Sequence, residues 1–302
     1  MARLANLIAC ACLAAASPLN AGDGQPIADE VVTGATDRAN RMTVPVTIAG
    51  HGPFHFLIDT GSQATVVTRG LRDRLQLPSL GQATLVGMAA RRQVELVRVD
   101  GLEFAARVFD AIKAPLLEAQ HVGADGILGL DSLQDLRVLI DFRAETVAVN
   151  DARALGGDRG YEIVVRARNR LGRLIITQAT VDGVRTAVVI DTGAQGSMGN
   201  RALEKRLCGR ERGEVTTTDV TGATLVGNLK HAGVLEIGRM RLAGVPIAYA
   251  DAPAFAALGL ADKPAMVLGI GDLRSLDRIA IDFAQRSVLF DVPSSAIAGG
   301  QP

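Results

Sequence analysis

The tripeptide Asp-Thr-Gly occurs twice in this chain of 302 residues, each time at the end of an apolar run. Phe54 to Ser62 reads Phe-His-Phe-Leu-Ile-Asp-Thr-Gly-Ser, and Thr186 to Ala194 reads Thr-Ala-Val-Val-Ile-Asp-Thr-Gly-Ala. At this composition, two such copies behind matching runs are improbable by chance. Each run is rich in β-formers and is predicted to be a strand that delivers its aspartate to a turn. Two carboxyl groups on equivalent turns indicate a dyad that shares one proton, with one carboxyl as acid and the other as base.

The surroundings of the two motifs also repeat. Each motif is preceded by a predicted hairpin, formed by Met42 to Ile48 with Phe54 to Ile58 and by Leu174 to Val181 with Val184 to Ile190. Each is followed by a short helix, a glycine-containing hairpin, an apolar-apolar-Gly element and a strand that ends in Asp-Phe. These later features are Arg69 to Leu77, Gly81 to Arg92, Ile127-Leu128-Gly129 and Val138 to Phe142 in the first half, and Met198 to Leu207, Thr216 to Asn228, Val267-Leu268-Gly269 and Ile279 to Phe283 in the second. Four matches in the same order predict a duplication, and hence two homologous lobes built mainly of β-strands with a few short helices.

The repeat and the turn-rich segments set the predicted boundaries. We expect a signal peptide at 1–16, a linker at 17–40, an N-terminal lobe at 41–150, an inter-lobe linker at 151–159, a C-terminal lobe at 160–292 and a tail at 293–302.

The N-terminus has the pattern of a secretory signal. Arg3 precedes the apolar run from Leu4 to Ala16, which ends in Ala-Ala-Ala and is too short to span a bilayer. Export to the periplasm or the medium is therefore expected, with no transmembrane span. Leu7-Ile8-Ala9-Cys10 also resembles a lipoprotein signal, so a lipid-bearing Cys10 is the alternative. After cleavage at Ala16, Cys208 would be the one remaining cysteine, and no internal disulfide could form.

Composition argues against several partners. Hydrophobic residues make up 48% of the chain, charged residues 21%, and the net charge is zero. This balance does not favour a polyanionic ligand. The chain lacks tryptophan and has two tyrosines, so base-stacking surfaces are not expected and nucleic acid is not a predicted partner. His51 and His55 flank a predicted turn and do not indicate a metal site, and no cofactor is predicted.

At this point the sequence resembles the aspartic peptidases of the pepsin and retropepsin superfamily. Asp59-Thr60-Gly61-Ser62 is similar to the first pepsin motif, and Asp191-Thr192-Gly193-Ala194 to the retropepsin motif. Asp125-Gly126-Ile127-Leu128-Gly129-Leu130 is similar to a signature of the pepsin N-terminal lobe. The resemblance covers both lobes and implies a single-chain, bilobal bacterial form with retropepsin-like lobes. It implies an all-β fold of two homologous β-barrel lobes with a few short helices and the active-site cleft between them. It also implies an aspartic endopeptidase that uses no metal and no covalent intermediate.

Each residue of the two motifs has a predicted role. Asp59 and Asp191 are the candidate catalytic pair. Gly61 and Gly193 allow backbone amides to approach the carboxyl groups, and Thr60 and Thr192 are expected to form hydrogen bonds across the lobe interface. Ser62 can donate a hydrogen bond to Asp59, whereas Ala194 has no hydroxyl to offer Asp191, so Asp59 is predicted to ionise first.

The glycine-containing hairpins are the candidate flaps over the substrate. Gly87 and Met88 lie near the centre of the first, and Thr221 and Gly222 near the centre of the second. Pepsin-type enzymes carry a tyrosine on this hairpin, but Tyr161 and Tyr249 lie outside both segments. The flaps therefore resemble the retropepsin kind.

The predicted function is hydrolysis of extended polypeptides by water that the Asp59 and Asp191 dyad activates. The alternative is an inactive peptide-binding module on the same scaffold. A monomer is expected, because one chain carries both motifs. A dimer formed by chain exchange is the second alternative.

Overall fold

The computed structural model describes residues 31–33, 35–36, 42–207 and 211–293. The predicted signal peptide with Cys10, the following residues up to position 30, Cys208 and the tail from position 294 lie outside the described residues.

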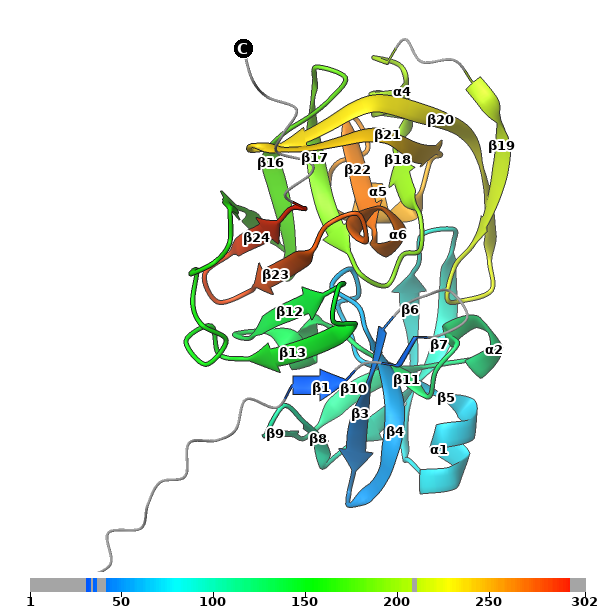
Figure 1. The fold of residues 1–302 in the computed structure, drawn as a ribbon. Helices are drawn as coiled ribbons and strands as arrows, with labels where there is room; N and C mark the ends of the chain where they lie inside the picture. The colour runs from blue at the N-terminus through cyan, green and yellow to red at the C-terminus, as the bar shows by residue number, and fades with distance from the viewer. Residues whose placement is uncertain (1–30, 34, 37–41, 208–210, 294–302) are drawn as a thin grey trace, which may run out of the picture.

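The N-terminal lobe is a strongly curved ten-stranded sheet with three short helices (Figure 1). Its strands run in the order β6-β7-β10-β5-β11-β4-β3-β8-β9, and β2 pairs with β3. Their bounds are β2 (Ala35–Thr36), β3 (Met42–Ile48), β4 (His51–Ile58), β5 (Val66–Thr68), β6 (Ser79–Val86), β7 (Arg91–Val99), β8 (Leu102–Phe104), β9 (Arg107–Phe109), β10 (Ile112–Leu117) and β11 (Gly126–Leu128). The helices are α1 (Arg69–Leu75), α2 (Ala119–Val122) and α3 (Leu130–Leu133).

The C-terminal lobe repeats this plan with an eight-stranded sheet in the order β15-β16-β17-β22-β18-β21-β20-β19. Its strands are β15 (Arg168–Arg170), β16 (Arg173–Val181), β17 (Val184–Asp191), β18 (Ser197–Gly199), β19 (Glu211–Thr218), β20 (Thr224–Ile237), β21 (Met240–Tyr249) and β22 (Ala265–Gly269). The helices are α4 (Arg201–Glu204), α5 (Pro253–Ala257) and α6 (Ile270–Leu273). In both lobes a short buried strand, β11 or β22, runs parallel to the strand before Asp-Thr-Gly and antiparallel to the strand after it.

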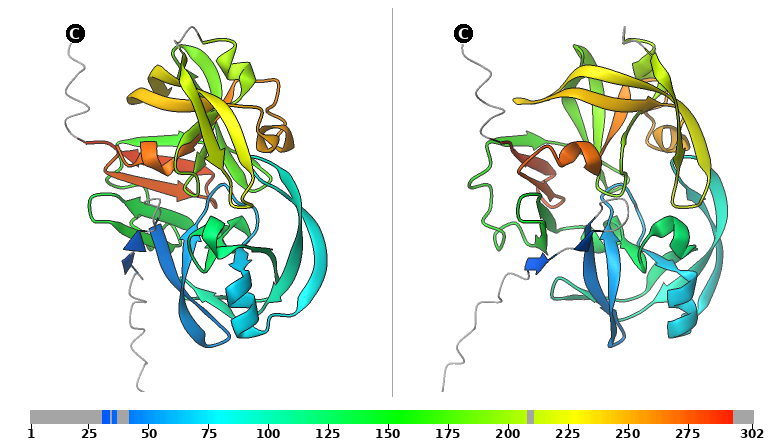
Figure 2. Two further views of the ribbon diagram at one scale, coloured as in Figure 1. Left: turned by 90° about the vertical axis from the view of Figure 1, so that its right-hand side faces the viewer. Right: turned by 45° about the vertical axis from the view of Figure 1, so that its right-hand side comes forward.

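A third sheet joins the lobes, and its six strands come from both halves of the chain (Figure 2). They are β1 (Val31–Thr33), β13 (Thr146–Asn150), β12 (Arg137–Asp141), β23 (Arg278–Asp282), β24 (Ser287–Asp291) and β14 (Ile163–Arg166), in that order. At its centre β12 pairs antiparallel with β23, and Leu139 lies opposite Ala280. β12 and β23 are equivalent strands of the two sequence repeats, so an approximate two-fold axis relates the repeats at this pairing. These observations confirm the predicted all-β fold of two lobes.

Two local predictions were wrong. Residues 17–40 were expected to form a linker, but Val31–Thr33 pairs with β13 and Ala35–Thr36 pairs with β3. These short strands extend sheets that the rest of the chain has already built, so the segment needs little β-pattern of its own. The predicted helix from Met198 is also shorter than expected, because Met198 lies in β18 and α4 begins at Arg201.

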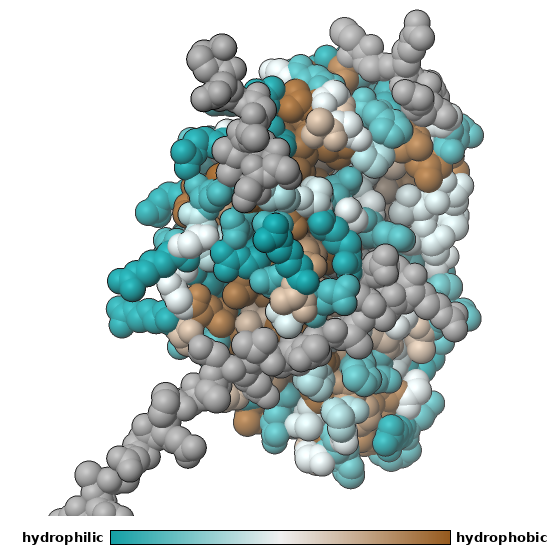
Figure 3. Space-filling model, in the orientation of Figure 1, coloured by the Kyte–Doolittle hydropathy of each residue, from teal (hydrophilic) through white to brown (hydrophobic). Residues whose placement is uncertain are grey.

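The core is aliphatic with a few phenylalanines and runs without a break from one lobe through the joining sheet to the other. The face seen in Figure 3 is mainly hydrophilic, and its apolar residues form small separate patches. No helix among the described residues has the length and apolar character needed to cross a membrane.

Candidate active site

Asp59 and Asp191 follow equivalent strands where the two lobes meet. β4 ends at Ile58 and β17 ends at Asp191. The amide of Asp59 donates to the carbonyl of Leu128 on β11 at 3.1 Å, and Asp191 lies in register with Gly269 on β22. Because β11 and β22 are buried throughout, they hold the two turns from behind.

Two backbone amides of the same turn bind one oxygen of each aspartate carboxyl. Asp59 Oδ1 accepts from Gly61 at 2.8 Å and from Ser62 at 2.9 Å. Asp191 Oδ1 accepts from Gly193 at 2.9 Å and from Ala194 at 3.0 Å. The backbone therefore orients the two carboxyl groups in the same way.

Gly61 and Gly193 also make room for the carboxyl group of the opposite lobe. A Cβ atom on Gly61 would lie 2.3 Å from Asp191 Oδ2, and one on Gly193 would lie 2.4 Å from Asp59 Oδ2. Such distances are shorter than any van der Waals contact, so a side chain at either position would displace a carboxyl group. The glycines thus let each carboxyl cross the lobe interface and approach the other.

Thr60 and Thr192 join the two turns by hydrogen bonds across the lobe interface, as predicted. The amide of each threonine donates to the hydroxyl oxygen of the other at 3.2 Å. Each hydroxyl in turn donates to a carbonyl of the opposite lobe, Thr60 to Ile190 at 3.0 Å and Thr192 to Ile58 at 2.6 Å. Both threonines are buried, so these four bonds are shielded from water and fix the relative position of the aspartates.

The hydrogen bond from Ser62 that was predicted to make Asp59 ionise first is not formed. The Ser62 hydroxyl donates to the carbonyl of Ala64 at 2.8 Å and not to Asp59. Burial, the charge of Asp191 and a hydrogen bond between the two carboxyl groups raise the pKa of Asp59 to about 8. The Gly61 amide and the charge of Arg173 act in the opposite direction but do not outweigh them. Asp59 therefore keeps its proton well above the usual pH range of a carboxyl group.

Arg173 was not among the predicted site residues. It is the first residue of β16 in the C-terminal lobe, and its Nε donates to the carbonyl oxygen of Gly61 in the N-terminal lobe. Burial lowers the pKa of Arg173, while the charges of Asp191 and Asp59 oppose that change. A cation at the start of the hairpin that precedes the second motif was visible in the sequence, but its distance from the dyad along the chain gave no reason to select it.

Asp131 and Asp272, which are not predicted site residues, support the strands that leave the two turns. Asp131 accepts from the Thr65 amide at 2.8 Å and from the Thr65 hydroxyl at 2.6 Å. The hydroxyl of Ser197, the equivalent of Thr65, donates to Asp272. Each hydroxyl oxygen also accepts a hydrogen bond from the glycine amide of the apolar-apolar-Gly element. Gly129 donates to Thr65, and Gly269 donates to Ser197. A hydroxyl six residues after each aspartate was the signal that could have revealed this pair of contacts.

The two predicted flaps are hairpins whose tips meet. β6 and β7 enclose the tip with Gly87 and Met88, and β19 and β20 enclose the tip with Thr221 and Gly222. In Figure 1 the β19/β20 hairpin descends from the upper lobe to α2 and β7 of the lower one. The Ala89 amide on one tip donates to Asp219 Oδ2 on the other at 2.9 Å.

Asp219 also shapes its own tip and was missed by the sequence reasoning. Its Oδ1 accepts from the amide of Thr221 at 2.9 Å, from the Thr221 hydroxyl at 2.6 Å and from the Ala223 amide at 3.2 Å. A Cβ atom on Gly87 would lie 2.3 Å from Asp219 Oδ2, so the glycine allows the carboxylate to approach. An aspartate two residues before Thr-Gly in a predicted hairpin is typical of such a turn and was the available signal.

Each flap packs on the lobe opposite to its own. Met88 of the N-terminal lobe packs against a cluster of buried apolar residues in the C-terminal lobe, and Ala194 and Leu225 pack against the same cluster. The cluster consists of Ile175, Val189, Met198, Ala252, Phe255, Leu258, Leu260, Ala265 and Val267. Val220 of the C-terminal lobe contacts an N-terminal cluster made of Leu57, Val66, Leu117, Val122 and Ile127. Because Ala194 belongs to the second Asp-Thr-Gly turn, Met88 shares an apolar surface with that turn.

Comparison with known proteins agrees with this geometry. A family model described as "Aspartyl protease" matches the chain twice, over residues 44–132 and 177–271. Each match contains one Asp-Thr-Gly motif, and together they cover more than half of the chain. A search of curated proteins finds no match.

Proposed function

This chain belongs to the aspartyl protease family, and from that premise we propose that it is an aspartic endopeptidase acting on extended polypeptides. The observation that carries the proposal is the reciprocal packing of each aspartate carboxyl against the glycine of the opposite turn. A raised pKa of Asp59 fits a pair that holds one proton between its two carboxyl groups.

In the proposed mechanism the dyad activates a water molecule. The ionised Asp191 carboxylate accepts a proton from water while the protonated Asp59 donates a hydrogen bond to the carbonyl oxygen of the scissile peptide. The water oxygen forms a bond to the carbonyl carbon, and the Asp59 proton passes to the carbonyl oxygen. The product is a neutral tetrahedral diol, with the proton of the pair now on Asp191.

The second half of the reaction breaks the carbon–nitrogen bond. Asp191 gives its proton to the amide nitrogen, and Asp59 takes one back from a diol hydroxyl as the carbonyl re-forms. The products are a carboxylic acid and an amine, and the dyad returns to its starting protonation state. The hydrogen bonds between Thr60 and Thr192 keep both carboxyl groups in place throughout, and this supplies the orientation that the reaction needs.

An extended peptide is the proposed substrate, held under the two flaps. A strand-like peptide can form main-chain hydrogen bonds with flap backbone, and such bonds do not depend on side-chain identity. Gly87, Met88, Thr221 and Gly222 are the proposed covering residues. Because Ala89 and Asp219 join the two tips, entry of a long chain requires this contact to open.

Both halves of the site come from one chain, so we propose that the monomer is the active form. A monomeric mass with full activity would support it, and activity confined to a dimer would support chain exchange.

We also propose that the protein is exported, with the signal removed after Ala16. Intact mass of the native product distinguishes this from cleavage before Cys10 with lipid attached.

The rival is an inactive peptide-binding module. The test is cleavage of a denatured protein between about pH 3 and 7, with and without a transition-state-mimicking aspartic protease inhibitor. Wild type should cleave, the inhibitor should block cleavage, and Asp59→Asn and Asp191→Asn should be inactive. Asp251→Asn is the matched control, because Asp251 is exposed and lies in a loop before α5. Binding of the peptides without cleavage by wild type would favour the rival.

A further inference from the structure

We propose that Arg173 is a positioning residue that holds a positive charge beside the dyad and thereby sets the pH range in which the pair carries a single proton. This inference rests on the proposed function, since it assigns a role in that reaction.

The guanidinium of Arg173 is anchored to the residue that contacts both aspartates. Its Nε donates to the carbonyl oxygen of Gly61. The amide of Gly61 binds Asp59 Oδ1 at 2.8 Å, and the Cα of Gly61 faces the carboxyl group of Asp191. The cation is thus fixed to the N-terminal turn by a hydrogen bond, although it belongs to the C-terminal lobe.

Among the described residues no ion pair neutralises the charge of Arg173. The hydrogen bond of its guanidinium there runs from Nε to the Gly61 carbonyl oxygen. Arg137 shows the opposite case, because Asp282 and Asp158 both pair with its guanidinium. The field of Arg173 is therefore available to the two carboxyl groups.

Three groups on three elements make up this electrostatic unit. The ionisable groups that act on Asp59 are Asp191, at the end of β17, and Arg173, at the start of β16. Those that act on Arg173 are Asp191 and Asp59. Arg173 favours the ionised form of the pair, while burial and mutual repulsion favour the protonated form. A nearby cation thus keeps one carboxylate available as the base in a site that otherwise retains protons.

The test compares wild type with Arg173→Gln, which removes the charge, and Arg173→Lys, which keeps it. Arg185→Gln is the matched control, because Arg185 is an exposed residue of β17 and its loss changes the net charge equally. The pH profile of kcat/KM is measured for all four proteins. The side-chain carboxyl groups of Asp59 and Asp191 are titrated separately by carbon-13 NMR, a readout that does not need activity.

With Arg173→Gln both limbs of the profile and both carboxyl titrations should move to higher pH. At a fixed pH on the acid limb, kcat/KM should fall about ten-fold if the midpoint moves up by about one pH unit. Arg173→Lys and Arg185→Gln should retain the wild-type midpoints. If Arg173→Gln fails to fold, Arg173→Met keeps the apolar stem and also removes the charge.

Two results would overturn the inference. One is an equal loss of kcat/KM at every pH with unmoved titrations, which would mean that Arg173 only ties the lobes together. The other is the same change in midpoints in Arg173→Lys as in Arg173→Gln. If wild type cleaves nothing at any pH, the proposed function fails, but the carboxyl titrations still decide the effect of Arg173.

Discussion

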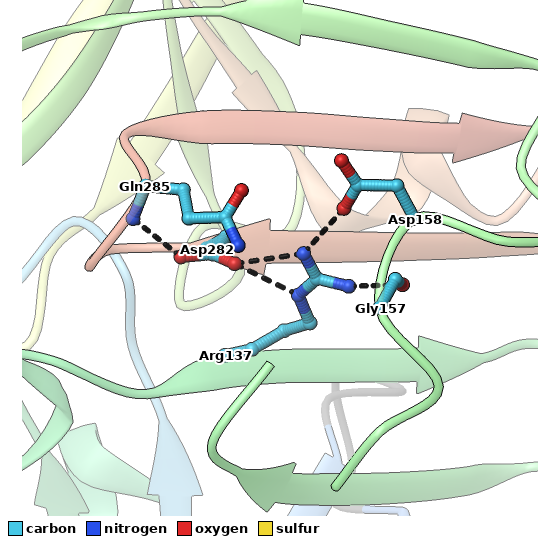
Figure 4. Close-up of polar contacts among 5 residues, drawn as sticks. All are labelled: Arg137, Gly157, Asp158, Asp282 and Gln285. Carbon is cyan, nitrogen blue, oxygen red and sulfur yellow. Dashed lines mark hydrogen bonds and ion pairs between the residues drawn. The ribbon is translucent and has the colours of Figure 1, made fainter. Parts of the chain in front are cut away.

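Arg137 and Asp282 form a buried ion pair at the junction of the two lobes. They are register partners on β12 and β23, Arg137 Nη2 lies 2.7 Å from Asp282 Oδ2, and neither side chain is exposed (Figure 4). The equivalent positions at the other end of the strand pair, Asp141 and Arg278, are register partners too, but Arg278 pairs with Asp291 instead.

The segment between β13 and β14 contacts both arginines, but among the described residues it supplies a carboxylate, that of Asp158, to Arg137 and not to Arg278. Arg137 also donates to the carbonyl of Gly157 and to Asp158 in the linker, which therefore covers one end of the strand pair (Figure 4). The two repeats therefore carry similar Arg and Asp positions in different networks: Arg137 pairs with Asp282 and Asp158, whereas Arg278 pairs with Asp291.

Arg137→Met should destabilise the protein by about 3–5 kcal/mol, because it leaves Asp282 buried without its cation. Urea unfolding measures this change. Arg143→Gln, the control, removes an exposed partner of Asp277 and should cost less than about 1 kcal/mol. In Arg137→Met with Asp282→Leu much of the loss should be recovered; equal losses in the single and double variants would contradict the assignment.

Gly61→Ala should abolish most of the proposed activity while leaving the fold intact. The new Cβ would lie 2.3 Å from Asp191 Oδ2, so the carboxyl must move by a distance that typically costs a factor of about 100 in rate. Peptide cleavage and a circular dichroism spectrum are the measurements. Gly196→Ala is the matched control, because nothing lies within 4 Å of its Cβ position. Unchanged cleavage by Gly61→Ala would show that the reaction tolerates displaced carboxyl groups.

The raised pKa of Asp59 should make the protein less stable as the pH rises. The folded pair holds a proton up to about pH 8, whereas the unfolded chain releases it near 3.8. This contribution to stability is complete below 3.8 and is lost as the pH rises through about 8, with a slope of at most about 1.4 kcal/mol per pH unit.

Urea unfolding at a series of pH values tests that sign. In Asp59→Asn the decline over this window should be smaller than in wild type, because the titrating carboxyl is gone. Asp251→Asn should keep the wild-type dependence. An equal decline in Asp59→Asn and in wild type would mean that Asp59 is ionised in the folded protein at neutral pH.

The sequence predicted those parts of the site that depend on local pattern. Apolar alternation and turn residues place Asp59 and Asp191 after equivalent strands, and the repeat itself implies that the turns face each other. The bonds between Thr60 and Thr192 follow once that pairing is assumed.

The parts that were missed depend on how the lobes are oriented or on competition between nearby acceptors. Ser62 has a carbonyl two residues away and binds it instead of Asp59. The contacts of Arg173 with Gly61, and of Asp219 with Ala89, join segments of different lobes. No local pattern specifies such contacts, because each depends on the final packing angle between the sheets.

Asp219→Asn should weaken the link between the flap tips without dismantling the tip that carries Asp219. The asparagine oxygen can take the place of Oδ1 and accept from Thr221 and Ala223. Its amino group would then replace Oδ2, and an amino group cannot accept from the Ala89 amide. Loss of a hydrogen bond to a charged group costs about 1.5–3 kcal/mol, so hydrogen exchange at the Ala89 amide should accelerate about ten-fold or more.

Thr221→Val is the control, because it removes a hydroxyl bond inside the tip and leaves the bond between the tips in place. Exchange at Ala89 should stay near the wild-type rate in the control. If the two variants accelerate exchange equally, Asp219 stabilises its own turn only, and the flaps are held together by Met88 and Val220 instead.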